Sequence, residues 1–515
     1  TETKIPDFAE VITGMTTGNN TEFLRLWTEI DISKAVIGAG DMSQVDVSNT
    51  YWIPYSKGGE RRNWYGNTDY LVNWGRKAEF NRSKTTLQHL YLKEALTWPF
   101  INTDTFSARF LPQGYLWDVA GSPCFFRDHN TAMYALGFLC SRLAALILSI
   151  VNPTINIQAI DICKLPLIID PECQQRVVSL VEENIKISKD EWDSYEMSWD
   201  FVRQPLCSGK TVSETYQLLK KEREDDYARS KKNEEELNRI FNKIYGVEED
   251  LSPVVDSKNM TLRLLDSHSA AIDLLSYAVG CMFGRYSLDV PGLAYAGGEW
   301  DDSKYCSFIP DKDNILPITD EEYFQDDIVG LFCGWLKKVY GAYTLEENLD
   351  FIAKALDNKG NTSREVIRNY FLNDFFKDHC STYSVTGSGK RPIYWLFDSG
   401  KQNGFKALIY MHRYDENTIG NLRIDYLHRM ERVYESEISR MQDIIDNSRD
   451  GREVTKATKR KEKLQKQIKE CKEYDEKIAH LALARIPIDL DDGVKVNYEK
   501  VQTVDGKKYP VLAKI

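Results

Sequence analysis

The feature that most constrains this chain is a hydrophobic pattern near its C-terminal end, repeated on both sides of a short polar loop at Ser448–Gly451. Apolar residues recur at spacings of three and four: Leu427, Met430, Tyr434, Ile438, Met441 and Ile445, and then Leu464, Ile468, Cys471, Tyr474, Ile478 and Leu481. Because this period matches one face of an α-helix, the pattern predicts two helices that pack as an antiparallel coiled-coil hairpin.

The second arm of this hairpin is strongly basic. Residues Arg452–Lys469 contain eight basic residues and two glutamates. Two interpretations stay open: the basic tip contacts DNA phosphates that flank a target site, or the hairpin docks a protein partner. We favour the partner, because the seam demands only packing and a run of charge is typical of a solvated helix face.

Length and composition bound the rest of the chain. The 515 residues correspond to about three domains, and 42% apolar with 28% charged residues is typical of a folded globular protein. We expect an α+β fold made of a small mixed α/β domain (1–173), a helical spacer (174–250), a mixed helix-plus-hairpin middle region (251–420) and the coiled-coil hairpin with a tail (421–515).

An apolar run of 18 residues, Tyr134–Val151, lies at the lower limit for spanning a membrane. Arg142 near its middle would be costly at the bilayer centre. The run therefore predicts a buried helix that ends at Asn152-Pro153, and no membrane segment. Other patterns predict helices in 174–200, 213–245 and 328–372, and a strand hairpin within 382–414.

Signatures of several enzyme classes are absent from the sequence. The ten cysteines are scattered, without the paired spacing of zinc ribbons or thioredoxins, and read as reduced thiols. Gly387-Ser388-Gly389-Lys390 is followed by Arg391 where a phosphate-binding loop needs Ser or Thr, so we interpret it as a structural turn. No two prolines are adjacent, which excludes the Asn-Pro-Pro-Tyr motif of amino-group DNA methyltransferases. We expect no catalytic residue, no metal site and no cofactor bound by this chain.

Charge is distributed unevenly along the chain. Residues 246–327 hold 17 acidic and 5 basic residues, a net of −12 that equals the formal charge of the whole chain, and we interpret them as a solvated acidic surface. Residues 50–93 hold eight basic and three acidic residues, interleaved with Trp and Tyr. Such a stretch favours contact with nucleic acid, since cations neutralise phosphates, although its aromatic residues could equally form the core of a small sheet.

Two segments resemble a known class of DNA-reading domain. Gly14–Leu24, with Thr17-Gly18-Asn19-Asn20 and Phe23, resembles the Thr-Gly-x-Asn-x-x-Phe opening of target-recognition domains in adenine DNA methyltransferases of the TaqI and type IIG kind. The run Tyr134–Val151, the turn Asn152–Gln158 and the segment Asp161–Pro166 resemble the close of the same domain. The resemblance implies that residues 1–173 are a DNA target-recognition domain.

Longer matches narrow the family. Tyr55–Asn67, Arg391–Gly400, Tyr410–Tyr414 and Asp491–Tyr498 resemble the PglX family, the adenine-specific DNA methyltransferases of type 1 BREX phage-defence systems. The resemblance runs from about residue 5 to the C-terminus. Members of that family carry an upstream catalytic domain that binds S-adenosylmethionine, and nothing in this sequence matches it. The resemblance, like the start at Thr1 without Met, implies a C-terminal piece that binds DNA without methylating it.

The resemblance and the basic stretch together suggest eleven DNA-contacting residues. We expect Lys57, Arg61, Arg62, Arg76 and Lys77 to contact phosphate or guanine, Asn63 and Asn67 to read adenine, Thr17, Asn19 and Asn20 to lie in a reading loop, and Gln158 to contact DNA or, preferably, to hold its turn together with Asp161.

The implied partners are double-stranded DNA, the upstream methyltransferase domain, other BREX proteins and acidic inhibitors that mimic DNA, all in the bacterial cytoplasm. Two alternatives remain open: an interaction scaffold of the defence complex with only weak DNA contact, or the specificity half of a type IIG restriction-modification enzyme. Duplex binding by this chain separates the reader from the scaffold.

Overall fold

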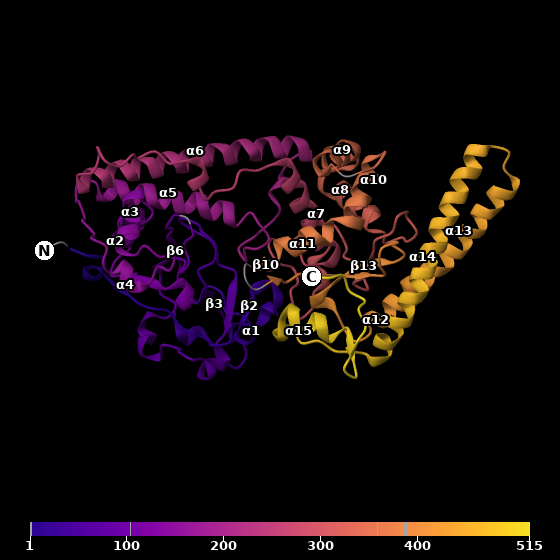
Figure 1. The fold of residues 1–515 in the computed structure, drawn as a ribbon, viewed down its shortest axis with the longest axis horizontal. Coiled ribbons are helices and arrows are strands. Elements are labelled where there is room, and N and C mark those ends of the chain that lie inside the picture. Colours follow the sequence, from indigo (N-terminus) through magenta and orange to yellow (C-terminus); the bar gives the residue numbers. More distant parts are fainter. Residues whose placement is uncertain (1–2, 104, 358, 386–388) are drawn as a thin grey trace. The chain divides into compact units, whose positions relative to one another are not determined.

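The computed structural model describes residues 3–103, 105–357, 359–385 and 389–515 (Figure 1). The fold is mixed α+β, as expected, with several small sheets and a long pair of helices near the C-terminal end. Contacts divide the chain into two compact units. Unit 1 comprises Thr1–Thr28, Ile32–Val202 and Leu218–Leu265, and unit 2 comprises Glu29–Asp31, Arg203–Gln217 and Asp266–Ile515.

Unit 1 contains two four-stranded sheets. One has the order β1 (Ala9–Val11), β8 (Pro123–Phe126), β5 (Ala95–Thr97) and β6 (Arg109–Leu111), with antiparallel neighbours. The other has the order β2 (Leu24–Leu26), β4 (Tyr70–Asn73), β3 (Trp52–Ser56) and β7 (Leu116–Trp117), where only β3 and β7 run parallel. A one-turn helix, α1 (Asn20–Phe23), leads into β2.

The aromatic residues of the basic stretch are core residues. Trp52, Tyr55, Trp64 and Trp74 are each at most 1% exposed. Trp74 packs edge-on against Phe80, with ring centroids 6.1 Å apart. Of the two interpretations of this stretch, its aromatic residues therefore fit the second: they build a sheet core and are not available for stacking on bases.

The helices of unit 1 are α2 (His129–Leu139), α3 (Arg142–Val151), α4 (Ala159–Ile162), α5 (Gln174–Trp192) and most of α6 (Val212–Tyr245). The prediction of one continuous helix over Tyr134–Val151 is wrong: α2 and α3 meet at an angle of 73°. The Ser141 hydroxyl accepts a hydrogen bond from Ala144 N (3.2 Å) and so starts a new helix. The predicted end before Asn152-Pro153 is confirmed, whereas α5 ends at Trp192, earlier than expected.

Among the described residues, α2 and α3 together pass a length and hydropathy test for a membrane span, and no single helix does. In α2, Thr131–Leu139 are all buried within the unit, where they face α5.

Unit 2 surrounds a three-stranded antiparallel sheet of order β12 (Tyr394–Asp398), β13 (Lys406–Tyr410) and β9 (Leu316–Pro317). The predicted strand hairpin is confirmed by the pairing of Tyr394 with Tyr410. Its other elements are α7 (Ser267–Phe283), α8 (Ile328–Tyr340), α9 (Leu345–Leu356), α10 (Ser363–Asn373), α11 (Phe375–Thr382), β10 (Ser384–Val385), β11 (Gly389–Lys390), α12 (Thr418–Asn421), α15 (Gly493–Lys500), β14 (Thr503–Val504) and β15 (Lys507–Lys508). The turn residues Gly387 and Ser388 lie outside the described residues.

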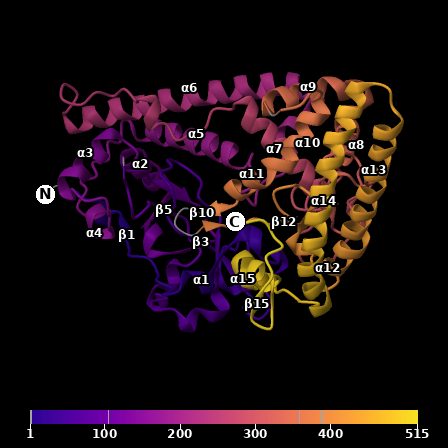
Figure 2. The ribbon, with the colours of Figure 1, turned by 45° about the vertical axis from the view of Figure 1, so that its right-hand side comes forward.

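The predicted helical hairpin is present in unit 2. Helix α13 (His428–Asn447) and helix α14 (Gly451–Ala484) lie side by side in both views (Figure 1, Figure 2). Seam residues from both helices are buried: Met430, Tyr434 and Met441 on α13, and Leu464, Cys471, Tyr474, Ile478 and Leu481 on α14. Asp450 accepts from Arg452 N (2.8 Å) and caps α14 directly after the loop.

A three-residue segment from the start of the chain, Glu29–Asp31, belongs to unit 2. The Glu29 carboxylate is fully buried and accepts hydrogen bonds from Arg391 Nη1 (3.0 Å) and Val494 N (2.9 Å). The Ile30 carbonyl accepts from His412 Nε2 (2.8 Å). These residues are therefore an integral part of the core of unit 2.

Candidate nucleic-acid interface

The segment that resembles a target-recognition motif forms a tight loop in unit 1. Gly18 has a φ of +86°, and a side chain there would meet Asn81 within 3 Å, so glycine is required. Asn19 caps α1: its Oδ1 accepts from Glu22 N (3.3 Å) and its Nδ2 donates to Glu22 Oε2 (3.1 Å). The buried Thr17 hydroxyl donates to Asn20 Oδ1 (2.7 Å). Asn19 and Asn20 are themselves exposed.

Residues 74–84 hold this loop from the side. Backbone hydrogen bonds of 2.9 Å join Thr16 and Arg82 in both directions. Arg76 forms ion pairs with Glu22 and Glu79. Its guanidinium lies 4.8 Å from the ring centre of Phe23, and the Lys77 ammonium lies 5.0 Å from that of Trp74.

The structure thus brings five predicted residues together with two cations that were not predicted as contacts. We call this group the loop surface: Thr17, Asn19, Asn20, Arg76, Lys77, Arg82 and Lys84. Partial burial and the neighbouring Arg82 lower the pKa of Lys84. Arg82 and Lys84 were counted in the basic stretch, and only the pairing of residues 16 and 82 reveals that they flank the loop.

Lys57 and Asn67 lie in a neighbouring turn and are used by the fold. Lys57 Nζ pairs with the buried Asp118 (2.9 Å), which also accepts from the Tyr55 hydroxyl (3.1 Å). Asn67 has a φ of +57°, and its Nδ2 donates to the carbonyls of Gly58 (3.1 Å) and Glu60 (2.8 Å). The amide nitrogen that would read adenine therefore closes the turn instead.

Arg62 is buried against α5, and this placement argues against its prediction as a DNA contact. Its guanidinium forms an ion pair with Glu191, donates to the carbonyls of Tyr65 (2.6 Å) and Ser188 (3.2 Å), and lies 5.0 Å from the ring centre of Trp192. A guanidinium saturated in this way holds the sheet to the helix.

Arg61 and Asn63, on either side of Arg62, contact the segment that follows α6. Arg61 Nη2 donates to the Asn259 carbonyl (2.6 Å), and Asn63 N donates to the Thr261 hydroxyl (3.2 Å). Asn63 is 4% exposed, so its side chain is not available as an adenine reader in this conformation. Neither residue joins the loop surface.

Gln158, whose side chain is exposed, directly precedes α4. Its backbone N–H donates to Asp161 Oδ2 (3.0 Å), and the same oxygen accepts from Asn152 Nδ2 (2.7 Å). Lys164 pairs with the other oxygen (3.3 Å). Asp161 thereby fixes the turn after α3 through contacts within residues 152–164.

One carboxyl group near these residues has an unusual titration. Glu234 of α6 is buried and accepts from Trp64 Nε1 (2.8 Å). Burial raises the pKa of Glu234 from 4.5 to about 7, against the opposing effect of the Trp64 hydrogen bond. The Glu234 carboxyl therefore titrates within the physiological pH range. Its raised pKa indicates that the packing around Glu234 and Trp64 excludes water.

Within the described residues, one group of carboxylates has the spacing of a cation site: Asp311, Asp313 and Asp326 in unit 2. The Tyr426 hydroxyl lies 2.8 Å from Asp313 and 2.5 Å from Asp326. Burial and the adjacent Asp313 raise the pKa of Asp311 to about 7. The Tyr426 hydroxyl already contacts two of these three carboxylates, so packing within unit 2 accounts for their close spacing.

Comparisons with known proteins agree with the resemblance noted in the sequence. No family model matches the chain. The chain is 41% identical over 510 residues to the adenine-specific methyltransferase PglX of Lacticaseibacillus casei (strain Zhang), covering 95% of this chain and 42% of the relative. It is 34% identical over 520 residues to the adenine-specific methyltransferase BrxX of Escherichia coli O9:H4 (strain HS), covering 94% and 42%. The chain thus spans about 42% of the length of these curated relatives, and it is homologous over nearly its whole length to a portion of PglX and BrxX adenine-specific methyltransferases.

Proposed function

We propose that this chain reads the DNA sequence for an adenine-specific methyltransferase of a BREX defence system, and that the methyl transfer takes place in another part of the same enzyme. Two facts support the proposal. The chain is homologous to part of two adenine-specific methyltransferases, and its sequence lacks the Asn-Pro-Pro-Tyr motif of such enzymes.

The observation that carries the proposal is the loop surface of unit 1. Here two exposed asparagines stand on a glycine-fixed turn beside a group of cations, Arg76, Lys77, Arg82 and Lys84. Asparagine can bond base edges in the major groove, and arginine and lysine bind phosphates or guanine. The loop surface therefore combines asparagines that can specify the base sequence with cations that can position the DNA backbone.

The mechanism that follows is a division of labour. The loop surface of this chain would place the duplex in register, with Asn19 and Asn20 on base edges and Lys77, Arg82 and Lys84 on flanking phosphates. A catalytic domain elsewhere in the enzyme, bound to S-adenosylmethionine, would rotate the target adenine out of the helix and methylate its N6 amine. Arg61, Arg62 and Asn63 contact α5 or the segment that follows α6 and would not enter the groove.

Duplex binding by the 515-residue chain tests the proposal. The variant Lys77→Gln, Arg82→Gln, Lys84→Gln removes three cations of the loop surface. Each neutralised phosphate contributes about 0.9 to the salt slope, so the loss of affinity between roughly 50 and 200 mM salt should shrink by about 40-fold. Fluorescence anisotropy with a duplex selected from a random pool measures this change.

A matched control removes the same charge from unit 1 at a distance along the chain: Lys221→Gln, Lys232→Gln, Lys243→Gln, all exposed on α6. It should leave the slope within about one unit of the parent. The substitution Asn20→Ala should flatten the sequence preference in the same assay. A parent chain that binds no duplex at low salt would favour the interaction scaffold, and equal slopes for both triple variants would reject the loop surface.

An acidic DNA mimic offers an independent check. A protein that presents rows of carboxylates should displace bound duplex from the loop surface, because both ligands satisfy the same cations. Displacement that persists in the Lys77→Gln, Arg82→Gln, Lys84→Gln variant would place the competition elsewhere on the chain.

A further inference from the structure

Helix α14 carries a regular row of cations on one face. Arg452, Lys456, Lys459, Lys463 and Lys466 follow one another at spacings of four, three, four and three residues. At a rise of 1.5 Å per residue, the row is about 21 Å long. We call it the basic stripe. All five members are exposed, and the side chain of Lys463 is 50% exposed.

The basic stripe is separate from the seam that holds the hairpin together. The buried residues of this part of α14 are Ala457, Leu464 and Gln467, and none of them belongs to the stripe. The exposed positions around the stripe are polar, and within Arg452–Lys466 the described chain has no exposed large apolar residue. A protein interface has a desolvated apolar or aromatic centre, which this face lacks.

In the part of the chain that the structure describes, Lys463 is the member of the row that pairs with a carboxylate, Asp320, and repulsion between the other members is not relieved by an ion pair. On α5 and α6 lysines stand four residues before a carboxylate, as in Lys186–Asp190 and Lys231–Glu235. On the basic stripe the residue four positions after Arg452, Lys456 or Lys459 is another cation. Like charges at this spacing destabilise a helix by about 0.2–0.5 kcal/mol per pair. Within the described residues, Lys456, Lys459 and Lys466 form no ion pair with a carboxylate.

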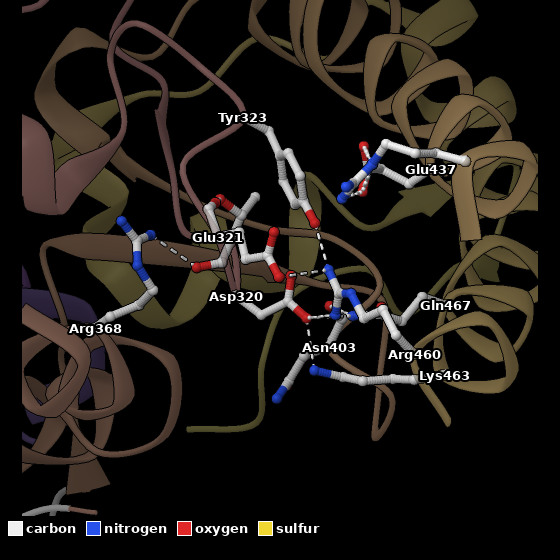
Figure 3. A network of polar contacts seen from close by, with 11 residues as sticks. Asp320, Glu321, Tyr323, Arg368, Asn403, Glu437, Arg460, Lys463 and Gln467 are labelled. Carbon is white, nitrogen blue, oxygen red and sulfur yellow. Dashed lines mark hydrogen bonds and ion pairs between the residues drawn. The ribbon is translucent and has the colours of Figure 1, made fainter. Parts of the chain in front are cut away.

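One end of the stripe already binds an oxyanion from its own chain. Figure 3 shows Arg460 and Lys463 directed at Asp320, with Nη1 at 2.8 Å and Nζ at 2.6 Å from the same oxygen. Gln467 Nε2 lies 3.4 Å from that oxygen, and Arg460 also contacts Glu321 (3.2 Å). Burial acts to raise the pKa of Asp320, but the hydrogen bonds from Arg460 and Lys463 outweigh it and the pKa is lowered.

The loop that presents Asp320 is itself anchored. Arg368 Nη1 donates to the Thr319 carbonyl (2.9 Å) and pairs with the buried Asp327 (2.7 Å). The carboxylate therefore occupies one fixed anion position. Arg452, Lys456 and Lys459 extend the same face toward the tip of the hairpin without a carboxylate opposite them.

We propose that the basic stripe binds the phosphate backbone of duplex DNA without regard to sequence. A duplex carries about one negative charge per 1.7 Å of its axis, so a row of cations some 21 Å long has phosphates opposite it throughout. Phosphate oxygens relieve the repulsion between successive lysines in the way Asp320 does for Arg460 and Lys463. The stripe is in unit 2 and supplies affinity, whereas the loop surface in unit 1 supplies sequence preference.

The test neutralises the stripe but leaves the Asp320 contacts intact. In the variant Arg452→Gln, Lys456→Gln, Lys459→Gln, Lys466→Gln, the 515-residue chain should lose affinity equally for a preferred and a scrambled duplex. The loss of affinity between roughly 50 and 200 mM salt should shrink by about 150-fold, as expected for four phosphate contacts. The ratio of affinities for the two duplexes should stay that of the parent.

The matched control is Lys337→Gln, Lys338→Gln, Lys354→Gln, Lys377→Gln, which removes the same charge from exposed positions on α8, α9 and α11 of the same unit. Equal salt dependence of the two variants overturns the proposal. So does a stripe variant that loses binding to poly-glutamate but not to duplex, since the partner would then be an acidic protein. A flattened sequence preference with unchanged salt slope would assign the stripe to base reading and also reject it. If the loop-surface proposal alone fails, the Asn20→Ala chain keeps the sequence preference of the parent while the stripe variant still loses its salt dependence.

Discussion

Two basic stretches of this chain look alike in the sequence and differ in the structure. In residues 57–62 the cations are drawn into the fold: Arg62 pairs with Glu191, Lys57 with Asp118, and Arg61 with a backbone carbonyl. On α14 the cations of the basic stripe stand on one exposed helix face. The number of positive charges in a stretch therefore does not decide whether they remain available to a ligand.

The periodicity of the neighbours explains the difference. In residues 50–93 the cations alternate with buried aromatic residues such as Trp64 and Trp74, and the backbone turns Arg62 into the interior. On α14 the spacing of four and three keeps successive cations on one side while the seam is buried elsewhere. A buried guanidinium needs a carboxylate or carbonyl partner, and an exposed one does not.

The largest expected effect is on the free energy of unfolding and concerns Arg62, the buried cation of residues 50–93. Arg62→Ala leaves Glu191 buried without its partner and should lower the free energy of unfolding by about 3–5 kcal/mol. Arg452→Ala on the stripe should change it by less than about 0.5 kcal/mol. Urea denaturation of both variants measures the contrast. Similar midpoints for the two would mean that Arg62 is as dispensable to the fold as an exposed residue.

The second effect is pH-dependent and concerns the packing under the same stretch. The pKa of Glu234 is raised on folding, so the native state takes up a proton and stability falls as the pH rises from about 4.5 to about 7. Glu234→Gln removes that penalty and keeps the acceptor for Trp64. The variant should be more stable than the parent by about 2–3 kcal/mol at pH 8.

Near pH 4.5 and below, where Glu234 is protonated in both states, the two proteins should unfold at nearly the same denaturant concentration. Denaturation profiles at several pH values give the comparison. A stability difference that does not vary with pH would show that the pKa of Glu234 is not raised and that its carboxyl group is solvated.

The smallest expected effect concerns Arg460, which lies beside the basic stripe and contacts other residues of unit 2. Arg460 is 19% exposed and binds Asp320 and Tyr323. Arg460→Ala should cost about 1.5–3 kcal/mol at neutral pH, the range for a hydrogen bond to a charged group. Because the pKa of Asp320 is lowered, this contribution exists above its ordinary value of 3.8 and is lost as the pH falls through the lowered value.

The unfolding free energies of Arg460→Ala and the parent should therefore converge under acid conditions. Lys459→Ala, one residue earlier and exposed, is the matched control and should be neutral at every pH. Equal effects of the two substitutions would place Arg460 among the solvated residues of the stripe.

Local patterns predicted much of the fold. The seam of the helical hairpin, the end of α3 before a proline and the strand hairpin of unit 2 each follow from neighbouring residues. The break between α2 and α3 was missed because hydropathy alone was continuous, although Ser141 is a favourable residue for starting a helix.

The grouping of the candidate contacts could not be predicted, because the partners lie far away in the sequence. Arg62 meets Glu191 at a separation of 129 residues, and Arg61 meets Asn259 at a separation of 198. The sequence of residues 50–93 does not indicate that Glu191 and Asn259 are these partners. Conversely, the pairing of Thr16 with Arg82 placed two cations beside the reading loop, and only the folded sheet shows it.

The segment Glu29–Asp31 has a consequence for how the chain is made. Glu29 meets Arg391 and Val494 across 362 and 465 residues, and Ile30 meets His412 across 382. The residues up to Arg391 must therefore leave the ribosome before this carboxylate can meet its guanidinium, and until then unit 2 lacks a piece of its interior. An expression clone that starts after residue 31 would still encode the rest of unit 2, yet leave Arg391 without its buried counter-ion.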